Sequence, residues 1–412
     1  MFVPRRIATK LLRLVRTFPA VAVTGARQTG KTTLLLRLFG DRAEHIVFDP
    51  IVDVGRARED PELFLANHNP PLILDEIQYA PQLASSLKRK VDRESRKGRY
   101  LITGSQQWNV MKLLAESLAG RVGFVDLDAF SLQEVHRGNE KTSWLELWLK
   151  NPQRWVRERK RLHRHRVKLY QHIWKGSLPE AHLAQLKSIP DFWKAYERTY
   201  IERDVRQMAE ISNLALFTRF FRLVAALTAQ EINYSELGRE IGVTPQTSQR
   251  WLSILQSSFQ WYAVPAYSRN SIKKVSERPK GHFGDTGLVC HALAISTPGA
   301  LESHPAWGAI FESAVYGELR KLSGAMDTPP HVYHWRAHSG AEIDFVLERD
   351  GMLYPIEAKG KQSITRHDVK GLKAFREAFP REQIAPGLII APVEEIAQIT
   401  ENDYVVPWDL VG

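Results

Sequence analysis

Short apolar runs alternate with amphipathic stretches over the first 136 residues of the chain. Each run is short enough for a buried strand, and each stretch between runs repeats its apolar residues at helical spacing. This alternation predicts an α/β fold, in which helices flank a parallel sheet. The predicted strands are Ala20–Thr24, His45–Phe48, Pro71–Leu74 and Arg99–Thr103.

The pattern changes further along the chain. Residues 141–205 read as helical throughout, residues 206–290 read as short helices with a small hairpin, and a mixed α/β pattern returns from about residue 300. We therefore expect an α/β domain, a helical linker, a helix-turn-helix domain and a second α/β domain. In chain order their expected ranges are 1–140, 141–205, 206–295 and 296–412.

The segment after the first predicted strand has the pattern of a phosphate-binding loop. Residues 25–32 read Gly-Ala-Arg-Gln-Thr-Gly-Lys-Thr and match G-x-x-x-x-G-K-[ST] in full. Glycines let the backbone curl so that its N–H groups point at phosphate, and the start of the next helix adds a favourable dipole. Lys31 is expected to reach the β- and γ-phosphates of ATP, and Thr32 to hold Mg²⁺. The expected nucleotide-binding residues are Gly25, Ala26, Arg27, Gln28, Thr29, Gly30, Lys31, Thr32 and Thr33.

The apolar run that begins at Leu72 ends in two acidic residues, Asp75 and Glu76. Open α/β sheets bind their ligands at the carboxyl ends of the strands, so both carboxylates would reach the nucleotide. We expect Asp75 to hold Mg²⁺ through water, and Glu76 to orient or activate the attacking water. The alternative is a helix start with two surface acids, which the upstream phosphate-binding loop disfavours.

Two further residues are candidates for sensing the nucleotide. The run from Tyr100 ends in hydroxyl residues, and a strand in this position lies between the other two, so Ser105 or Thr103 could sense the γ-phosphate. An ordinary strand–turn transition is the alternative. Arg121 could be an arginine finger that stabilises charge in a neighbouring subunit of a ring or dimer. A surface arginine after a glycine C-cap fits the same residues.

The third region has the pattern of a helix-turn-helix. Ser235–Ile241 reads as a helix with Ser235 as its N-cap, Gly242 begins the turn, and Thr244–Leu255 reads as the second helix. Polar side chains of the types that contact base edges in the major groove lie on the second helix. They are Gln246, Thr247, Gln249 and Arg250.

A wing and a basic stretch would extend this surface. Phe259–Val264 and Ser271–Val275 could form the two strands of the wing, although winged helices also serve as packing modules or subunit contacts. Arg154–Lys168 carries eight Lys or Arg against one acid, and we expect a basic helix that neutralises DNA phosphates or is simply solvated. The basic residues near the wing are Lys273, Lys274, Arg278 and Lys280.

Two stretches near the carboxyl end, Glu342–Leu347 and Tyr354–Lys359, alternate between the two sides of a strand. Asp350-Gly351 between them is a hairpin turn signal. With that turn, the residue numbers of each cross-strand pair sum to 701, so Asp344 lies opposite Glu357. Both carboxylates are expected to face outward. The residues expected to face the core are Ile343, Phe345, Leu347, Ile356 and Ala358.

Lys359 falls on the same face as the two acids, so two carboxylates and a lysine converge. This D…E-x-K arrangement resembles that of the restriction-endonuclease-like nucleases. In such a site the carboxylates hold Mg²⁺, the metal lowers the pKa of a bound water, and the lysine positions the water or stabilises charge. Glu312, on the preceding helix, could add a third acid. The alternative is a surface ion pair on a sheet that only binds.

Charge and composition narrow the class of partner. The net charge of +11 favours DNA or another acidic surface. Cys290 is the single cysteine, which excludes an internal disulfide and fits the reducing cytoplasm. No run approaches the roughly 18 apolar residues of a membrane span, and no signal-peptide pattern is apparent, so we expect no membrane partner.

These motifs together resemble the prokaryotic AAA-type ATPases that carry a C-terminal domain of unknown function. The resemblance implies an AAA+ module, a helical and winged-helix middle, and a nuclease-like C-terminal domain. The basic stretch Arg154–Lys168 looks like an enlargement of the usual linker. The matching segments are 25–33, 74–78, 101–105, 116–121, 176–180, 200–205, 283–287, 340–344 and 356–359.

Two hypotheses of function follow. The first is an ATP-dependent enzyme that acts on DNA, with a metal-dependent nuclease-like C-terminal domain. The second is a nucleotide-driven signalling or defence switch, whose C-terminal domain binds a protein partner without cleaving. A plain transcription regulator is disfavoured by the full set of hydrolysis residues at Lys31, Asp75 and Glu76.

Overall fold

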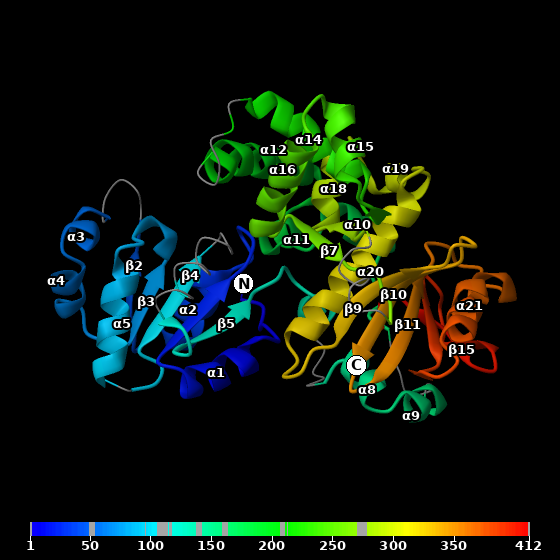
Figure 1. Ribbon diagram of the computed structural model, residues 1–412, viewed down its shortest axis with the longest axis horizontal. Helices are drawn as coiled ribbons and strands as arrows, with labels where there is room; N and C mark the ends of the chain where they lie inside the picture. Colours follow the sequence, from blue (N-terminus) through cyan, green and yellow to red (C-terminus); the bar gives the residue numbers. More distant parts are fainter. Residues whose placement is uncertain are drawn as a thin grey trace. The chain divides into compact units, whose positions relative to one another are not determined.

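The computed structural model of the chain contains two compact units (Figure 1). The first comprises Met1–Phe130 with Ser257–Phe259, and the second comprises Ser131–Gln256 with Gln260–Gly412. No helix in the described parts of the chain is long and apolar enough to span a bilayer. The described residues are 2–48, 54–94, 96–104, 114, 118–136, 142–158, 164–206, 211, 213–269 and 278–410.

A parallel sheet forms the centre of the first unit. Its described strands lie in the order β2-β3-β4-β1-β5, and all neighbouring pairs are parallel. The predicted α/β fold is therefore confirmed, and β4 lies between β3 and β1 as expected. The strands are β1 (Ala20–Thr24), β2 (Glu44–Val47), β3 (Leu72–Asp75), β4 (Tyr100–Gly104) and β5 (Val122–Asp126).

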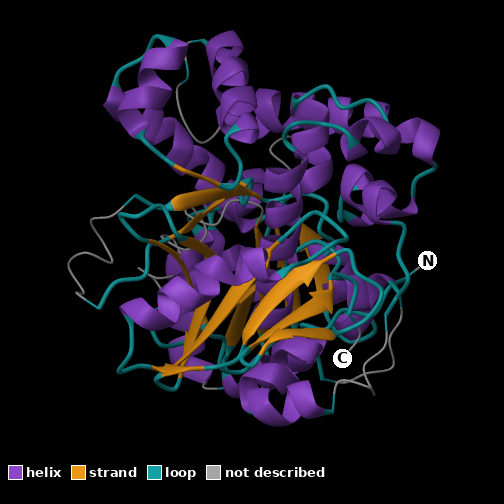
Figure 2. Cartoon of the chain, turned by 90° about the vertical axis from the view of Figure 1, so that its right-hand side faces the viewer, coloured by secondary structure: helices purple, strands orange, loops and turns teal. Residues whose placement is uncertain are grey.

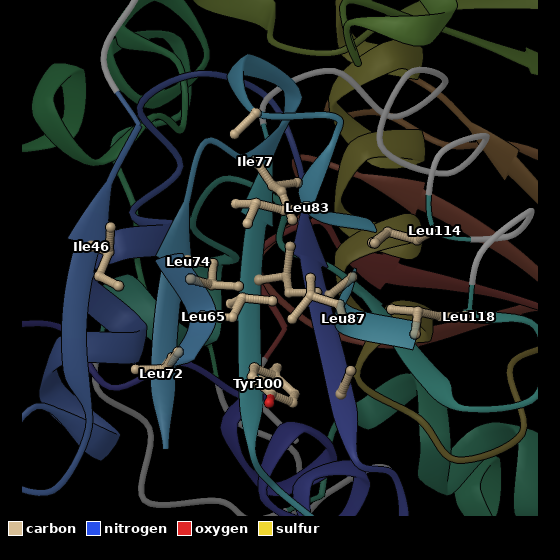
Figure 3. Packing of buried hydrophobic residues seen from close by; sticks show 14 of the residues in the cluster. Ile46, Leu65, Leu72, Leu74, Ile77, Leu83, Leu87, Tyr100, Leu114 and Leu118 are labelled. Atoms are coloured by element: carbon tan, nitrogen blue, oxygen red, sulfur yellow. The ribbon is translucent and has the colours of Figure 1, made fainter. Parts of the chain in front are cut away.

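Side chains from alternate strand positions form the core of this unit (Figure 3). Leu72 and Leu74 of β3 belong to one buried cluster with Leu83 and Leu87 of α5. Residues on both sides of β1, β3 and β4 are buried. This explains why these strands read as continuous apolar runs. The helices here are α1 (Ala8–Thr17), α2 (Lys31–Phe39), α3 (Val54–Glu59), α4 (Pro61–Ala66), η1 (Ile77–Tyr79) and α5 (Leu83–Glu94).

The second unit contains two sheets (Figure 2). The larger has the order β14-β15-β13-β11-β10-β9, with β12 paired to β11, and the smaller is antiparallel with the order β6-β8-β7. The strands of the smaller sheet are β6 (Gln230–Glu231), β7 (Trp261–Val264) and β8 (Lys280–Phe283). Those of the larger sheet are β9 (His331–Arg336), β10 (Glu342–Arg349), β11 (Met352–Ala358), β12 (Gln383–Ile384), β13 (Gly387–Ala391), β14 (Ala397–Thr400) and β15 (Asp403–Pro407).

Helices pack against the larger sheet. Leu372 and Phe375 of α21 share a buried cluster with Ile343 of β10, whereas Tyr316 of α20 stacks on Phe345 with ring centroids 5.9 Å apart. The helices in this unit are α7 (Leu132–Val135), α8 (Trp144–Lys150), α9 (Pro152–Arg157), α10 (Leu169–Lys175), α11 (Pro179–Leu183), η3 (Leu186–Ser188), α12 (Ile189–Thr199), η4 (Tyr200–Val205), α14 (Leu214–Ala226), α15 (Tyr234–Ile241), α16 (Pro245–Ser257), α18 (Thr286–Ala292), α19 (Pro298–Glu302), α20 (Trp307–Gly324), η5 (Arg366–Val369) and α21 (Lys370–Ala378).

The predicted basic helix over residues 154–168 is wrong. Helix α9 ends at Arg157, residues 159–163 lie outside the described part, and residues 164–168 are not helical. The physical reason is a buried acid in the C-terminal segment. Arg164 Nε donates to Asp409 Oδ1 at 2.7 Å, and the two chain segments form a β-bridge. Part of the positive charge therefore compensates a buried carboxylate instead of facing solvent.

Asp285 joins two segments that lie far apart in the sequence. It is the N-cap of α18, where its Oδ1 accepts a hydrogen bond from Gly287 N at 2.8 Å. Its Oδ2 accepts bonds from Ser177 N and Ser177 Oγ at 2.8 and 2.9 Å. Gly176 has φ +81°, and a Cβ there would lie 2.1 Å from Asp285 Oδ1. The Gly176-Ser177 and Asp285–Gly287 segments thus form one buried joint.

Replacing Asp285→Ala should lower the free energy of unfolding of the second unit by roughly 3 kcal/mol, because a helix cap and two buried hydrogen bonds are lost together. Ser177→Ala removes only the Oγ bond and should lower it by about 1 kcal/mol. Urea denaturation followed by tryptophan fluorescence measures both changes. Equal losses in the two variants would contradict the joint described above.

Candidate functional site

The predicted phosphate-binding loop connects β1 to α2 at the carboxyl end of the first sheet. Gly25 has φ +149° and Gly30 has φ +91°. A Cβ on Gly25 would lie 2.2 Å from Leu127 O, so only glycine fits the start of the loop. The helix begins at Lys31 directly after Gly30. The loop therefore has the backbone curvature and the helix start that phosphate groups require.

Lys31 and Arg5 both bond to carbonyl groups of this loop. The Lys31 ammonium is buried and donates to Gly25 O at 2.9 Å and to Ala26 O at 2.8 Å. Arg5 Nη1 donates to Thr29 O at 2.8 Å, and its guanidinium lies over the Phe130 ring, 5.0 Å from the centroid. Sequence reasoning missed Arg5, since nothing in the amino-terminal stretch indicates that this arginine turns inward.

Asp75 is the centre of the hydrogen-bond network beside the loop. Thr32 Oγ1 donates to Asp75 Oδ2 at 2.8 Å, and Thr103 Oγ1 donates to the other carboxylate oxygen. His45 Nε2 lies 3.4 Å from Asp75 Oδ2. Sequence reasoning missed His45 also, because its position on β2 carries no motif. The network joins Thr32, Thr103 and His45 to Asp75 at one edge of the sheet.

Glu76 follows directly and has φ +57°, an unusual conformation for glutamate. Its backbone N–H donates to Thr103 Oγ1 at 3.0 Å, and its carboxylate accepts a hydrogen bond from the Gln78 amide. These bonds fix both the backbone and the side chain of Glu76 at the tip of β3. Unlike Asp75, Glu76 is only half-buried.

This site fits ATP with Mg²⁺. Gly25 and Gly30 have the positive φ angles that let the loop curl, Lys31 supplies a positive charge, and the Thr32 and Asp75 side-chain oxygens lie 2.8 Å apart. Hydroxyl and carboxylate oxygens are the ligands that Mg²⁺ prefers. Loop residues 25–30 with Lys31, Thr32 and Thr33 could hold the phosphates, as the sequence predicts.

Two candidate residues stand apart from this network. Ser105 lies outside the described residues. Arg121 precedes β5 at the amino-terminal edge of the sheet, opposite to the phosphate-binding loop, and its guanidinium pairs with Asp92. In its own subunit Arg121 is therefore not part of the site. A finger role in a neighbouring subunit stays a prediction.

A second cluster of charged side chains lies in the second unit. Lys359 Nζ is 2.8 Å from Glu357 Oε2 and 4.0 Å from Asp344 Oδ2, so the predicted carboxylates and lysine do converge. Two more residues join them from other elements. Lys280 Nζ of β8 is 2.7 Å from Glu312 Oε1 and 3.2 Å from Asp344 Oδ1. Sequence reasoning named Glu312 but assigned Lys280 to the wing alone.

The hairpin register is confirmed, with pairs from Phe345–Ile356 to Arg349–Met352 that sum to 701. The expected outward position of the acids is wrong, because Asp344 and Glu357 are 3% and 2% exposed. The expected strict alternation is also broken. An irregularity between Ile343 and Val346 in the pairing with β9 shifts the faces, so these two residues share one cluster.

Burial and like charges separate the pKa values of these acids. Burial and the charge of Asp344 raise the pKa of Glu312 to about 8 and raise the pKa of Glu357 well above its usual range. Burial acts on Asp344 in the same sense, but the charges of Lys280 and Lys359 outweigh it and hold the pKa of Asp344 below its ordinary value. Asp344 is therefore the most acidic of the three carboxyl groups.

In this arrangement the second cluster does not fit Mg²⁺. The ammonium of Lys280 lies between Glu312 and Asp344, Ala358 N donates to Asp344 Oδ2 at 2.9 Å, and Lys359 pairs with Glu357. Within the described ranges, no group of three or more His, Cys, Asp or Glu side chains is arranged to hold a metal ion. The carboxylates are compensated by lysines instead.

The predicted helix-turn-helix corresponds to α15 and α16, joined at Gly242 with φ +82°. The predicted N-cap Ser235 is wrong. Asn233 caps α15, because its Oδ1 accepts hydrogen bonds from Ser235 N and Glu236 N. β7 pairs with β8, and the predicted wing strand 271–275 lies outside the described residues. The exposed side chains of α16 include Gln246, Gln249 and Arg250.

Comparison with family models matches three parts of the chain. A model described as "AAA domain" matches residues 17–136. Two models described as domains of unknown function, DUF8612 and DUF4143, match residues 166–299 and 307–411. The parallel sheet, the phosphate-binding loop and the matched AAA domain define an AAA-type P-loop ATPase.

Sequence similarity to two relatives extends over the whole chain. The uncharacterized protein Rv2008c of Mycobacterium tuberculosis is 30% identical over 100% of this chain and 85% of its own length. The uncharacterized protein Mb2031c of Mycobacterium bovis matches to the same extent. The chain belongs to the same family as these two mycobacterial proteins.

Similarity to solved structures is weaker. The Walker-type ATPase paby2304 of Pyrococcus abyssi is 14% identical with a TM-score of 0.42, covering 71% of this chain and 96% of that one. The RuvB Holliday junction branch migration motor of Thermotoga maritima is 15% identical with a TM-score of 0.28, covering 64% and 91%.

Replacing Gly25→Ala should weaken nucleotide binding by at least about tenfold, because the added methyl group collides with Leu127 O and the φ of +149° strains any L-residue. Gly55→Ala is the matched control. A Cβ there meets nothing within 4 Å, so this variant should bind as the wild type does. Titration with a fluorescent ATP analogue measures both. Wild-type affinity in Gly25→Ala would contradict the loop geometry.

Proposed function

We propose that the chain hydrolyses ATP at the edge of the first sheet and uses the resulting conformational change to act on DNA. The ATPase part rests on one observation: Thr32 Oγ1 lies 2.8 Å from Asp75 Oδ2, next to a glycine loop that carries Lys31. Phosphate-binding and metal-binding groups from two segments, the start of α2 and the tip of β3, thus meet where open α/β sheets bind nucleotides.

Each residue then has a separate role. Lys31 would leave its loop carbonyls to contact the β- and γ-phosphates, Thr32 would ligate the metal, and Asp75 would hold it through water. Mg²⁺ neutralises charge on the phosphates when it is bound with ATP. Glu76, fixed by Thr103 and Gln78, orients the attacking water. Thr103 links the two acids and is therefore the described residue best suited to report changes at the γ-phosphate.

Action on DNA is supported by charge and by the surface of α16. The net charge is +11, and Gln246, Gln249 and Arg250 are exposed on the second helix of a helix-turn-helix. Amide and guanidinium groups on such a helix match the hydrogen-bonding edges of adenine and guanine in the major groove. The C-terminal carboxylate cluster, which resembles a nuclease site, would then hold or cut the bound DNA.

The nucleotide-driven switch is the second candidate, and one observation favours it. Lys280 and Lys359 compensate the acids that a nuclease would use for metal. In that case ATP rearranges the domains and the C-terminal domain binds a protein partner without cleaving. An oligomer in which Arg121 reaches a neighbouring nucleotide site fits both candidates.

Lys31→Ala should abolish ATP binding, and Glu76→Gln should bind ATP but hydrolyse it roughly a hundredfold more slowly, because the amide cannot activate water. Steady-state phosphate release and nucleotide binding separate the two effects. Glu62→Gln is the control, since Glu62 is exposed and pairs with Arg89 on the surface. Retained turnover in Glu76→Gln would remove that residue from the catalytic role.

The double substitution Gln249→Ala and Arg250→Ala should weaken duplex DNA binding by roughly tenfold or more. Binding by the wild type should also weaken as the salt concentration rises. Fluorescence anisotropy at low salt measures it, with the exposed Lys187→Ala as control. The absence of any DNA affinity in the wild type at low salt would exclude the DNA-acting function.

Cleavage separates the two candidates. The same DNA, in linear, nicked and single-stranded form, is incubated with Mg²⁺, with and without ATP. Cleavage that Asp344→Ala abolishes establishes the nuclease. Bound but intact DNA favours the switch.

A further inference from the structure

The buried ammonium of Lys280 joins three elements of the second unit. Its Nζ lies 2.7 Å from Glu312 Oε1 on α20 and 3.2 Å from Asp344 Oδ1 on β10. The Lys280 side chain is only 8% exposed, and those of Glu312 and Asp344 are 13% and 5% exposed. A single positive charge therefore lies within ion-pair distance of two acids from different elements.

The groups around this ammonium are those that bind a divalent cation. Carboxylate oxygens are preferred ligands of Mg²⁺ and Mn²⁺. A third ligand type points to the same place. His282 Nε2 is fully buried, has no hydrogen-bond partner, and lies 4.0 Å from Glu312 Oε1. An unbonded imidazole nitrogen in a buried position is costly unless something binds it.

Solvent reaches the edge of this cluster. A polar pocket of about 310 Å³ borders Lys280 and Glu312, and its other charged lining residues are Glu231, Arg336 and Glu342. A hydrated cation can enter a space of this size and polarity. The positive charge already in place is what would repel it.

Lys280 is held in position by the packing of its own strand. β8 pairs with both β6 and β7, and His334 of β9 contacts the carbonyl of Arg278 at 3.1 Å. Tyr267 N also donates to His334 O at 2.6 Å. The small sheet is thereby docked on β9, so Lys280 cannot withdraw unless that docking loosens.

We propose that Lys280 is a built-in counter-cation, whose ammonium takes the place of a divalent metal ion between Glu312 and Asp344 and keeps the cluster closed to metal while the β6-β8-β7 sheet is docked on β9. The biological purpose of this arrangement rests on the proposed function, in which the cluster acts on DNA. Occupancy of the cluster is nevertheless a property of the chain alone and can be measured without ATP or DNA.

The test measures Mn²⁺ binding to the whole chain in the absence of nucleotide, with electron paramagnetic resonance as the readout. Lys280→Ala should gain one site that binds Mn²⁺ at least about tenfold more tightly than the same cluster in the wild type. Lys280→Ala with Asp344→Asn should lose that site. Lys187→Ala, an exposed lysine of the same unit, should behave as the wild type.

Removal of a buried charge can prevent folding, so a second variant and a second readout are included. Lys280→Met with Glu312→Gln removes the ammonium together with one of its two acid partners and should also bind Mn²⁺ more tightly than the wild type. The melting temperature of Lys280→Ala should rise with Mn²⁺, whereas that of the wild type should not.

A folded variant without Lys280 that binds Mn²⁺ no more tightly than the wild type overturns the proposal. Failure of both variants to fold even in Mn²⁺ also counts against it, because the metal should then replace the ammonium. Tight Mn²⁺ binding at Asp344 in the wild type would show that Lys280 does not close the cluster. Loss of ATP turnover or DNA binding would instead concern the proposed function and would leave this readout unchanged.

Discussion

The bond between Thr32 and Asp75 is the interaction on which the nucleotide site depends. It connects the first turn of α2 to the tip of β3, although β4 lies between β3 and β1 in the sheet. Thr103 at the end of β4 fills the space between and bonds to the same carboxylate. A buried aspartate needs several donors, and the strand order supplies them from two directions. The backbone of Glu76 is fixed by the same hydroxyl.

Charge compensation has a comparable part in the second unit. Lys280, Lys359 and Arg164 each pair with acids that are nearly or completely buried. Such pairs contribute little net stability, because desolvation offsets their attraction, but an acid left without its cation would be strongly unfavourable. The pairs therefore fix which segments lie together more than they strengthen the fold. Lys280 does so for β8, α20 and β10.

Local signals explain what could be predicted from the sequence. The strands β1 to β4 of the first sheet, the phosphate-binding loop and the register of β10 with β11 all follow from patterns within a few residues, whereas β5 was not predicted. The partners of Lys280 are 32 and 64 residues away, so no local pattern reveals them. The same limit applies to Arg5 and His45, whose contacts depend on the assembled sheet.

The wrong predictions have physical causes of the same kind. A stretch rich in arginine satisfies the helical pattern, yet Asp409, some 245 residues away, holds Arg164 in an extended segment. Asn233 displaces Ser235 as a cap because its side chain reaches the first N–H groups of α15. Strand alternation predicts that the acids on β10 and β11 face water, but lysines from β8 and β11 make their burial tolerable.

The joint at Asp285 limits how this chain can be divided or recombined. The helix-turn-helix lies between Ser177 and Asp285 in the sequence, while the ends of that long excursion are bonded to each other. Trp174 Nε1 also donates to Ile295 O at 2.7 Å, which closes the same loop a second time. A fragment beginning at residue 206 would bury the Asp285 carboxylate without its serine partner. The segment between Ser177 and Asp285 therefore starts and ends at the same place in the fold. A chimera that takes this segment from a relative would have to include both bonded ends from the same protein.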